Sequence, residues 1–136
     1  MPEKRVLEKI DKLEGYLDEI EGAMPLTFEE YRKGYRKRAL ERLLQVSIET
    51  IIDVCNLILK EEKFGVPSDE EDVFSKLSQE EVLNESLADA LRKMRGFRNI
   101  LVHRYGEVDD RKVFKFLENE LDDFSLFISK IKSYLN

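Results

Sequence analysis

The 136-residue chain has very few of the residues that build disulfides and metal clusters. It holds one cysteine, Cys55, and one histidine, His103, so an intrachain disulfide and a cysteine-based metal cluster are both excluded. A lone cysteine suits a reducing compartment, and we expect a cytoplasmic protein. The charged opening "MPEKRVLEKI" does not resemble a signal peptide. No apolar run approaches the roughly 20 residues that span a bilayer.

Glycine and proline are also scarce, with six and three residues, and strand patterns are nearly absent. Apolar residues recur instead at helical spacing, which predicts helices over residues 3–23, 28–63 with a bend near Gly34, 69–77, 78–105 and 109–134. The expected N-terminal caps are Thr27 paired with Glu30, Ser68 or Asp69, Ser78 paired with Glu81, and Asp109. Short turns between such helices predict an all-α, antiparallel four- to five-helix up-and-down bundle forming a single domain over 1–136.

The net charge of −6 argues against nucleic acid, but the cations are gathered in two stretches. Residues 32–42, "RKGYRKRALER", hold one acid among six cations, and residues 92–104, "RKMRGFRNILVHR", hold no acid. Segregated charge of this kind produces a local positive field on an acidic protein. Two interpretations stay open on charge alone: a surface that attracts anions, or two solvated helix faces.

The segment "RNILVHRY", residues 98–105, places Arg98 in the middle of an apolar helical stripe. At 100° per residue, the side chains within about 60° of Arg98 are those of Leu87, Leu91, Met94, Leu101, Val102 and Tyr105. An unpartnered buried arginine is costly. Three explanations are open: pairing with an acid such as Glu49 or Asp53, burial at a protein interface, or binding of an anion such as phosphate.

Asn99 and His103 are four residues apart on a neighbouring polar stripe, so their side chains can touch. A histidine in the last turn of a helix also has a simpler explanation, since its positive form favours the helix dipole. Tyr105 has an equally simple explanation as a tyrosine at the edge of the core. The coincidence of Arg98, Asn99, His103 and Tyr105 within two turns makes a functional cluster the sharper hypothesis.

"FRNILVHRY" resembles the signature of HEPN domains, specifically the HepT-like toxins of HEPN/MNT toxin–antitoxin systems. The stretches "ERLLQVSIETIIDVCNLIL" and "YGEVDDRKVFKFL" are similar to that family too, so the resemblance covers nearly the whole chain. It implies a homodimer whose motifs face each other and a metal-independent ribonuclease acting on transfer or messenger RNA. It further implies a nucleotidyltransferase antitoxin that uses ATP and magnesium to add AMP to the motif tyrosine, here Tyr105.

Such cleavage uses the neighbouring 2′-OH of RNA as nucleophile and needs a base, an acid and a cation. The resemblance assigns catalytic roles to Arg98, Asn99 and His103, and two facing chains would supply two histidines. We expect the RNA backbone to be bound by Arg92, Arg95, Arg36 and Lys37. No resident cofactor or metal is expected. The alternatives are a non-catalytic HEPN module that binds nucleotide or serves as a scaffold for the nucleotidyltransferase, and a helical adaptor in which Arg98 is a structural ion pair.

Overall fold

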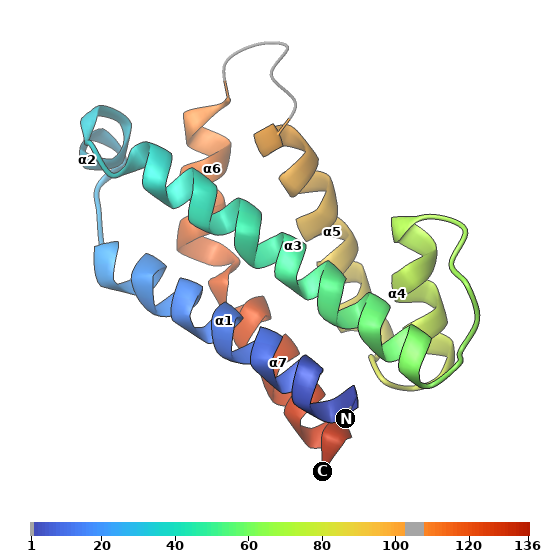
Figure 1. Ribbon diagram of the computed structural model, residues 1–136. Helices are drawn as coiled ribbons and strands as arrows, with labels where there is room; N and C mark the ends of the chain where they lie inside the picture. Colours follow the sequence, from blue (N-terminus) through green and yellow to red (C-terminus); the bar gives the residue numbers. More distant parts are fainter. Residues whose placement is uncertain (1, 103–107) are drawn as a thin grey trace.

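The computed structural model describes residues 2–102 and 108–136, and within these ranges it contains seven helices and no strand. The helices are α1 (Pro2–Ala23), α2 (Phe28–Lys33), α3 (Lys37–Glu61), α4 (Glu70–Gln79), α5 (Glu85–Val102), α6 (Asp110–Asn119) and α7 (Leu121–Leu135). Four rods, formed by α1, α3, α5 and the α6–α7 pair, alternate in direction, and α4 packs beside α3 and α5 (Figure 1). The predicted all-α up-and-down bundle is confirmed.

The core is one cluster to which all seven helices contribute buried or partly buried apolar side chains. Helix α1 packs along α3, and its predicted apolar stripe is buried throughout: Val6, Ile10, Leu13, Leu17 and Ile20. The apolar stripe predicted along α3 is buried as well, apart from the half-buried Leu43; it consists of Leu40, Leu43, Leu44, Ser47, Ile48, Ile51, Val54, Cys55, Ile58 and Leu59. Cys55 lies fully buried within that stripe. None of the helices in the described part of the chain is long and apolar enough to cross a membrane.

Three of the predicted helix caps are present. Thr27 and Glu30 form a complete capping box at the start of α2, and Asp69 accepts a hydrogen bond from the backbone N–H of Asp72. Asp109 accepts from the backbone N–H groups of Arg111 and Lys112 at the start of α6. These caps satisfy backbone donors that have no partner within their helices.

The bend predicted near Gly34 is a full break between α2 and α3. A Cβ atom at Gly34 would lie 2.4 Å from the backbone oxygen of Glu30, closer than any real Cβ contact, so only glycine fits there. At its other end α3 stops at Glu61 rather than at Lys63. Lys63 has a φ of 56°, in the left-handed region that cannot continue a helix.

The predicted cap by Ser78 and Glu81 is wrong. Helix α4 extends through Ser78 to Gln79, and Glu81 sits in a turn with a φ of 60°. That turn carries the side chains of Val82 and Leu83 into the core, where they are 0% and 1% exposed, so tertiary burial overrides the local cap signal. Helix α5 begins later, at Glu85, and the side chain of Asn84 caps it by accepting from the backbone N–H of Leu87 at 2.7 Å.

The single helix predicted over 109–134 is also wrong, because Glu120 separates α6 from α7. The break falls within "ENELDD", a run of acids that would repel one another in a continuous helix. With the break, Asp122 and Asp123 lie in the first turn of α7, where the helix dipole stabilises negative charge. The residues around the expected end of the 78–105 helix, Tyr105 and Gly106, lie outside the described residues.

Candidate functional site

Arg98 lies on the buried face of α5, as its position in the apolar stripe predicts. Leu87, Leu91 and Met94, one to three turns earlier on the same face, are at most 7% exposed. The Arg98 side chain itself is only 14% exposed. A guanidinium this far from water needs partners, and its charge must be met by acids from neighbouring helices.

Two carboxylates lie close to the guanidinium of Arg98. The side-chain Nη2 donates to Oε1 of Glu70 in the first turn of α4, and Nη1 lies 3.8 Å from Oε2 of Glu49 in α3. Of the two acids predicted from the sequence, Glu49 is therefore a neighbour of Arg98. Asp53 is not, since it forms an ion pair with Lys9 of α1 at 3.6 Å.

The remaining two arginines of this face, Arg92 and Arg95, are also paired with acids. Arg95 donates from Nε to Glu70 at 2.9 Å and from Nη1 to Glu71 at 3.1 Å. Arg92 donates to Asp89 at 2.6 Å. From the sequence, both are expected to bind the RNA backbone. The structure brings them together with Arg98 in one row along α5. Four carboxylates pair with these three arginines, those of Glu49, Glu70, Glu71 and Asp89.

Asn99 is the immediate chain neighbour of Arg98, and its Oδ1 accepts from Arg98 Nε at 3.0 Å. That oxygen therefore helps to orient the arginine. His103 and Tyr105, the other two members of the predicted cluster, lie outside the described residues. The described chain ends on one side of them at Val102 in α5 and resumes on the other at Val108, just before α6.

The other two residues predicted to hold RNA backbone lie at the start of α3 and differ in their surroundings. Arg36 is exposed, with its guanidinium 5.3 Å from the ring centre of Tyr35. Lys37 instead forms an ion pair at 2.8 Å with Asp110, the first residue of α6. Lys37 thus ties two helices together and is less available to an external phosphate than Arg36 is.

Beside this ion pair lies a group of buried polar atoms. The hydroxyl of Tyr31, which is 0% exposed, and Oε2 of Glu41 have no hydrogen-bond partner among the described residues. Burial raises the pKa of Glu41 above its ordinary value, and the negative charge of Asp110 acts in the same direction while Lys37 opposes it. Burial likewise raises the pKa of Tyr31 well above its ordinary value. The tyrosine and the carboxyl therefore both favour their neutral forms.

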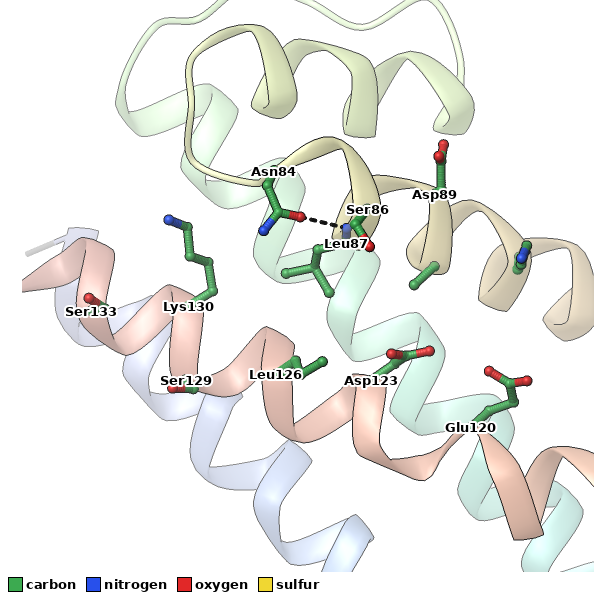
Figure 2. Close-up of a pocket in the computed structure, with 12 residues that line it drawn as sticks. Asn84, Ser86, Leu87, Asp89, Glu120, Asp123, Leu126, Ser129, Lys130 and Ser133 are labelled. Atoms are coloured by element: carbon green, nitrogen blue, oxygen red, sulfur yellow. Dashed lines mark hydrogen bonds between the residues drawn. The ribbon is translucent and has the colours of Figure 1, made fainter.

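A separate groove of about 670 Å³, which Arg98 does not line, runs between α5 and α7 (Figure 2). Its walls carry three acids, two lysines and a few small or apolar side chains: Asn84, Ser86, Leu87, Asp89, Ala90, Lys93, Glu120, Asp123, Leu126, Ser129, Lys130 and Ser133. None of the predicted site residues lines it. Across residues 2–102 and 108–136, no group of three or more histidine, cysteine or acidic side chains is arranged to hold a metal ion.

Glu70 and Glu71 were not among the residues predicted from the sequence. They belong to the acidic run "PSDEED", which on its own suggests only a solvated helix start. The sequence does indicate that acids are missing from this segment: residues 92–104 carry five cations and no acid, and one of those cations lies in an apolar stripe. Such a row needs acids from another helix, but spacing alone does not say which helix supplies them.

The fold and this arginine row define the class of protein: an all-helical bundle with a row of paired arginines along one helix. The profile of the family described as "Ribonuclease HepT-like" matches residues 8–131. The chain belongs to the ribonuclease HepT-like family.

Individual relatives agree with this assignment. The mRNA nuclease HepT of Shewanella oneidensis is 38% identical over 90 residues, which cover 66% of this chain and 68% of the relative. The tRNA nuclease HepT of Aphanizomenon flos-aquae is 28% identical over 128 residues, covering 93% of this chain and 87% of the relative. Among solved structures, a tri-AMPylated HEPN toxin of Shewanella oneidensis in complex with an MNT antitoxin superposes with a TM-score of 0.85 and 29% identity, covering 94% of this chain and 96% of the other.

Proposed function

We propose that this chain is an RNA endonuclease and the toxin of a HEPN/MNT toxin–antitoxin pair, acting in the cytoplasm as a single domain over residues 1–136. The observation that carries the proposal is the placement of Arg98: a largely buried, oriented side chain beside Asn99, in a chain of the ribonuclease HepT-like family. Two relatives named as mRNA and tRNA nucleases support RNA as the substrate.

The proposed reaction is attack of a ribose 2′-OH on the adjacent phosphorus. The new bond closes a 2′,3′-cyclic phosphate, and the bond to the 5′-oxygen of the next nucleotide breaks. His103 takes the proton from the 2′-OH or returns one to the departing 5′-oxygen, because histidine is the side chain suited to proton transfer near neutral pH. Arg98 stabilises the extra negative charge on the phosphate oxygens, and Asn99 holds Arg98 by its Nε.

The two proton transfers call for two acid–base groups, whereas one chain supplies a single histidine. We therefore propose a homodimer in which the two motifs face one scissile phosphate. Light scattering at micromolar concentration tests the dimer, and a monomer of 16.1 kDa would contradict it.

The proposed partner is a minimal nucleotidyltransferase, which would bind ATP and magnesium itself and transfer AMP to Tyr105. The solved complex of a tri-AMPylated HEPN toxin with an MNT antitoxin supports both the partner and the modification. An adenylyl group adds bulk and a negative phosphate close to the motif, and it would thereby repel RNA and compete for Arg98.

Purified protein incubated with total RNA in EDTA tests the activity. Cleavage should persist without divalent metal and leave 2′,3′-cyclic phosphate or 3′-phosphate ends. Arg98→Ala and His103→Ala should each lower the rate by roughly 10²–10³-fold, the usual effect of losing one oriented transition-state group. Lys93→Ala, an exposed cation on the same helix, is the matched control and should cleave at nearly the wild-type rate. Cleavage that requires added magnesium, or that is equal in all variants, would contradict the proposal.

One observation favours a second function, that of a non-catalytic scaffold for the nucleotidyltransferase. All three arginines along α5 are already matched by carboxylates, as they would be in a purely structural ion-pair network. A scaffold would bind the partner equally well with His103→Ala and would leave RNA intact under every condition. The RNA incubation therefore separates the two functions.

A further inference from the structure

Glu70 accepts hydrogen bonds from two arginines of α5, the helix that carries Arg98. Its Oε1 accepts a hydrogen bond from Arg98 Nη2 and another from Arg95 Nε at 2.9 Å. The residue lies 28 positions before Arg98 in the sequence and reaches it from the first turn of α4.

The contacts of Arg98 fix its guanidinium from three helices. Nε donates within α5 to Asn99 Oδ1 at 3.0 Å, Nη2 donates to Glu70 of α4, and Nη1 lies 3.8 Å from Glu49 of α3. Nε and Nη2 form one edge of the planar guanidinium, and both nitrogens donate, to Asn99 and to Glu70. Nη1 lies at ion-pair distance from Glu49 but makes no hydrogen bond to it, so a phosphate would bind the guanidinium through Nη1 in competition with Glu49.

Glu70 is itself held firmly. Helix α4 is anchored by Val73, Phe74 and Leu77, which are at most 1% exposed, and its first turn is capped by Asp69. Arg95 bridges Glu70 to Glu71. The carboxylate therefore has a defined position relative to α5, which is what an anchor for another side chain requires.

We propose that Glu70 is a positioning residue for Arg98 in the RNA-cleaving site, an inference that rests on the proposed function. It keeps Nη2 of the guanidinium turned toward α4, so that Nη1 is presented to the scissile phosphate in place of Glu49. Without Glu70, Arg98 would turn toward Glu49, which already lies within ion-pair distance, or toward water. Misplacement of a catalytic group by about 1 Å costs on the order of 10²-fold in rate.

The kinetic test compares three variants on a defined RNA. Glu70→Ala should lower kcat by roughly 10- to 100-fold with little change in KM, because the group that contacts the phosphate is retained but misoriented. Glu70→Gln should recover most of the rate, since its amide oxygen still accepts from Arg98. Glu71→Ala is the matched control, because it removes the same charge one residue away. In the wild type, Glu71 pairs with Arg92 and Arg95 but not with Arg98. The kcat of Glu71→Ala should stay close to that of the wild type.

Two outcomes would overturn the positioning role. If Glu70→Ala cleaves as fast as the wild type or faster, the carboxylate merely competes with RNA for the arginine. If Glu71→Ala lowers kcat as much as Glu70→Ala does, the loss comes from removing a negative charge from α4 and not from breaking the Glu70–Arg98 hydrogen bond. Thermal unfolding of each variant checks that α4 still packs.

A readout that needs no activity keeps this inference separate from the proposed function. In protein labelled with ¹⁵N-arginine, the Nη2–H signals of Arg98, whose nitrogen donates to Glu70, should exchange slowly with water in the wild type and in Glu71→Ala, and quickly in Glu70→Ala. Arg98→Lys identifies these signals. A wild type that cleaves no RNA would refute the ribonuclease proposal, while an Arg98 signal unaffected by Glu70→Ala would refute the positioning role.

Discussion

Phe97 and Phe116 are stacked, with their ring centres 4.3 Å apart and their ring planes inclined by 6°. Phe97 directly precedes Arg98 on α5, and Phe116 lies on α6, the helix that follows the motif in the chain. The stack therefore joins α5 to α6, the helices that precede and follow residues 103–107 in the chain.

Replacing Phe116 with leucine should lower the free energy of unfolding by about 1 kcal/mol, since an aromatic pair contributes about 0.5–1.5 kcal/mol beyond its buried area. RNA cleavage should slow as well, because α5 and α6 lose their fixed spacing next to the motif. Chemical denaturation and a cleavage assay measure the two effects. Phe127→Leu, at a fully buried position of α7, is the control that should lose stability but keep its cleavage rate. Equal slowing in both variants would show that stability alone is responsible.

Arg36 and Lys37 are neighbours in sequence but should behave differently when changed. Arg36→Ala should weaken RNA binding and reduce its salt dependence, because one cation that is exposed to solvent is lost. Lys37→Ala should instead lower thermal stability, because it leaves the partly buried Asp110 without its ion-pair partner. Binding titrations at two salt concentrations and thermal unfolding measure these effects. The reverse pattern would show that the lysine, and not the arginine, contacts the RNA.

Tyr105→Phe should retain most of the nuclease activity and escape inactivation by the nucleotidyltransferase, because the ring is kept while the hydroxyl that accepts AMP is lost. Intact-mass spectrometry after co-expression with the partner should show adenylyl groups on the peptide containing Tyr105 and none on that peptide in the variant. Adducts on Tyr35, which is 87% exposed, in place of Tyr105 would contradict the assignment.

Glu41→Gln should make the protein more stable at pH 7–8 and have little effect at pH 4. Burial raises the pKa of Glu41 above its ordinary value of 4.5, so the folded protein binds this proton more tightly than the unfolded chain. The stability that the protonated carboxyl contributes is fully present below pH 4.5 and is lost as the pH rises through the folded-state pKa. Melting temperatures across this range test the effect, with Glu118→Gln, an exposed position of α6, as the control. A variant that is less stable than the wild type at pH 8 would show that the carboxylate is well paired.

Much of the fold follows from the sequence alone. The apolar stripes of α1 and α3 repeat every three or four residues, which is the geometry of one helix face, and they are buried as predicted. The caps at Thr27, Asp69 and Asp109 and the break at Gly34 are equally local, since each depends on a side chain and a backbone group no more than four residues apart. The burial of Arg98 is of the same kind, because its place on α5 relative to Leu91 and Met94 is set by helical spacing.

Only the tertiary structure decides which side chains lie opposite the face of α5 that carries Arg98. Helix α4 packs against both α3 and α5, and this packing brings Glu70 to Arg98 across 28 residues of sequence. The same packing carries Val82 and Leu83 into the core and overrides the cap signal of Ser78. Local spacing fixes the direction in which a side chain points, because helix geometry is the same in every protein. The partner that it meets depends on how whole helices share one core, because burying apolar area decides which helices become neighbours.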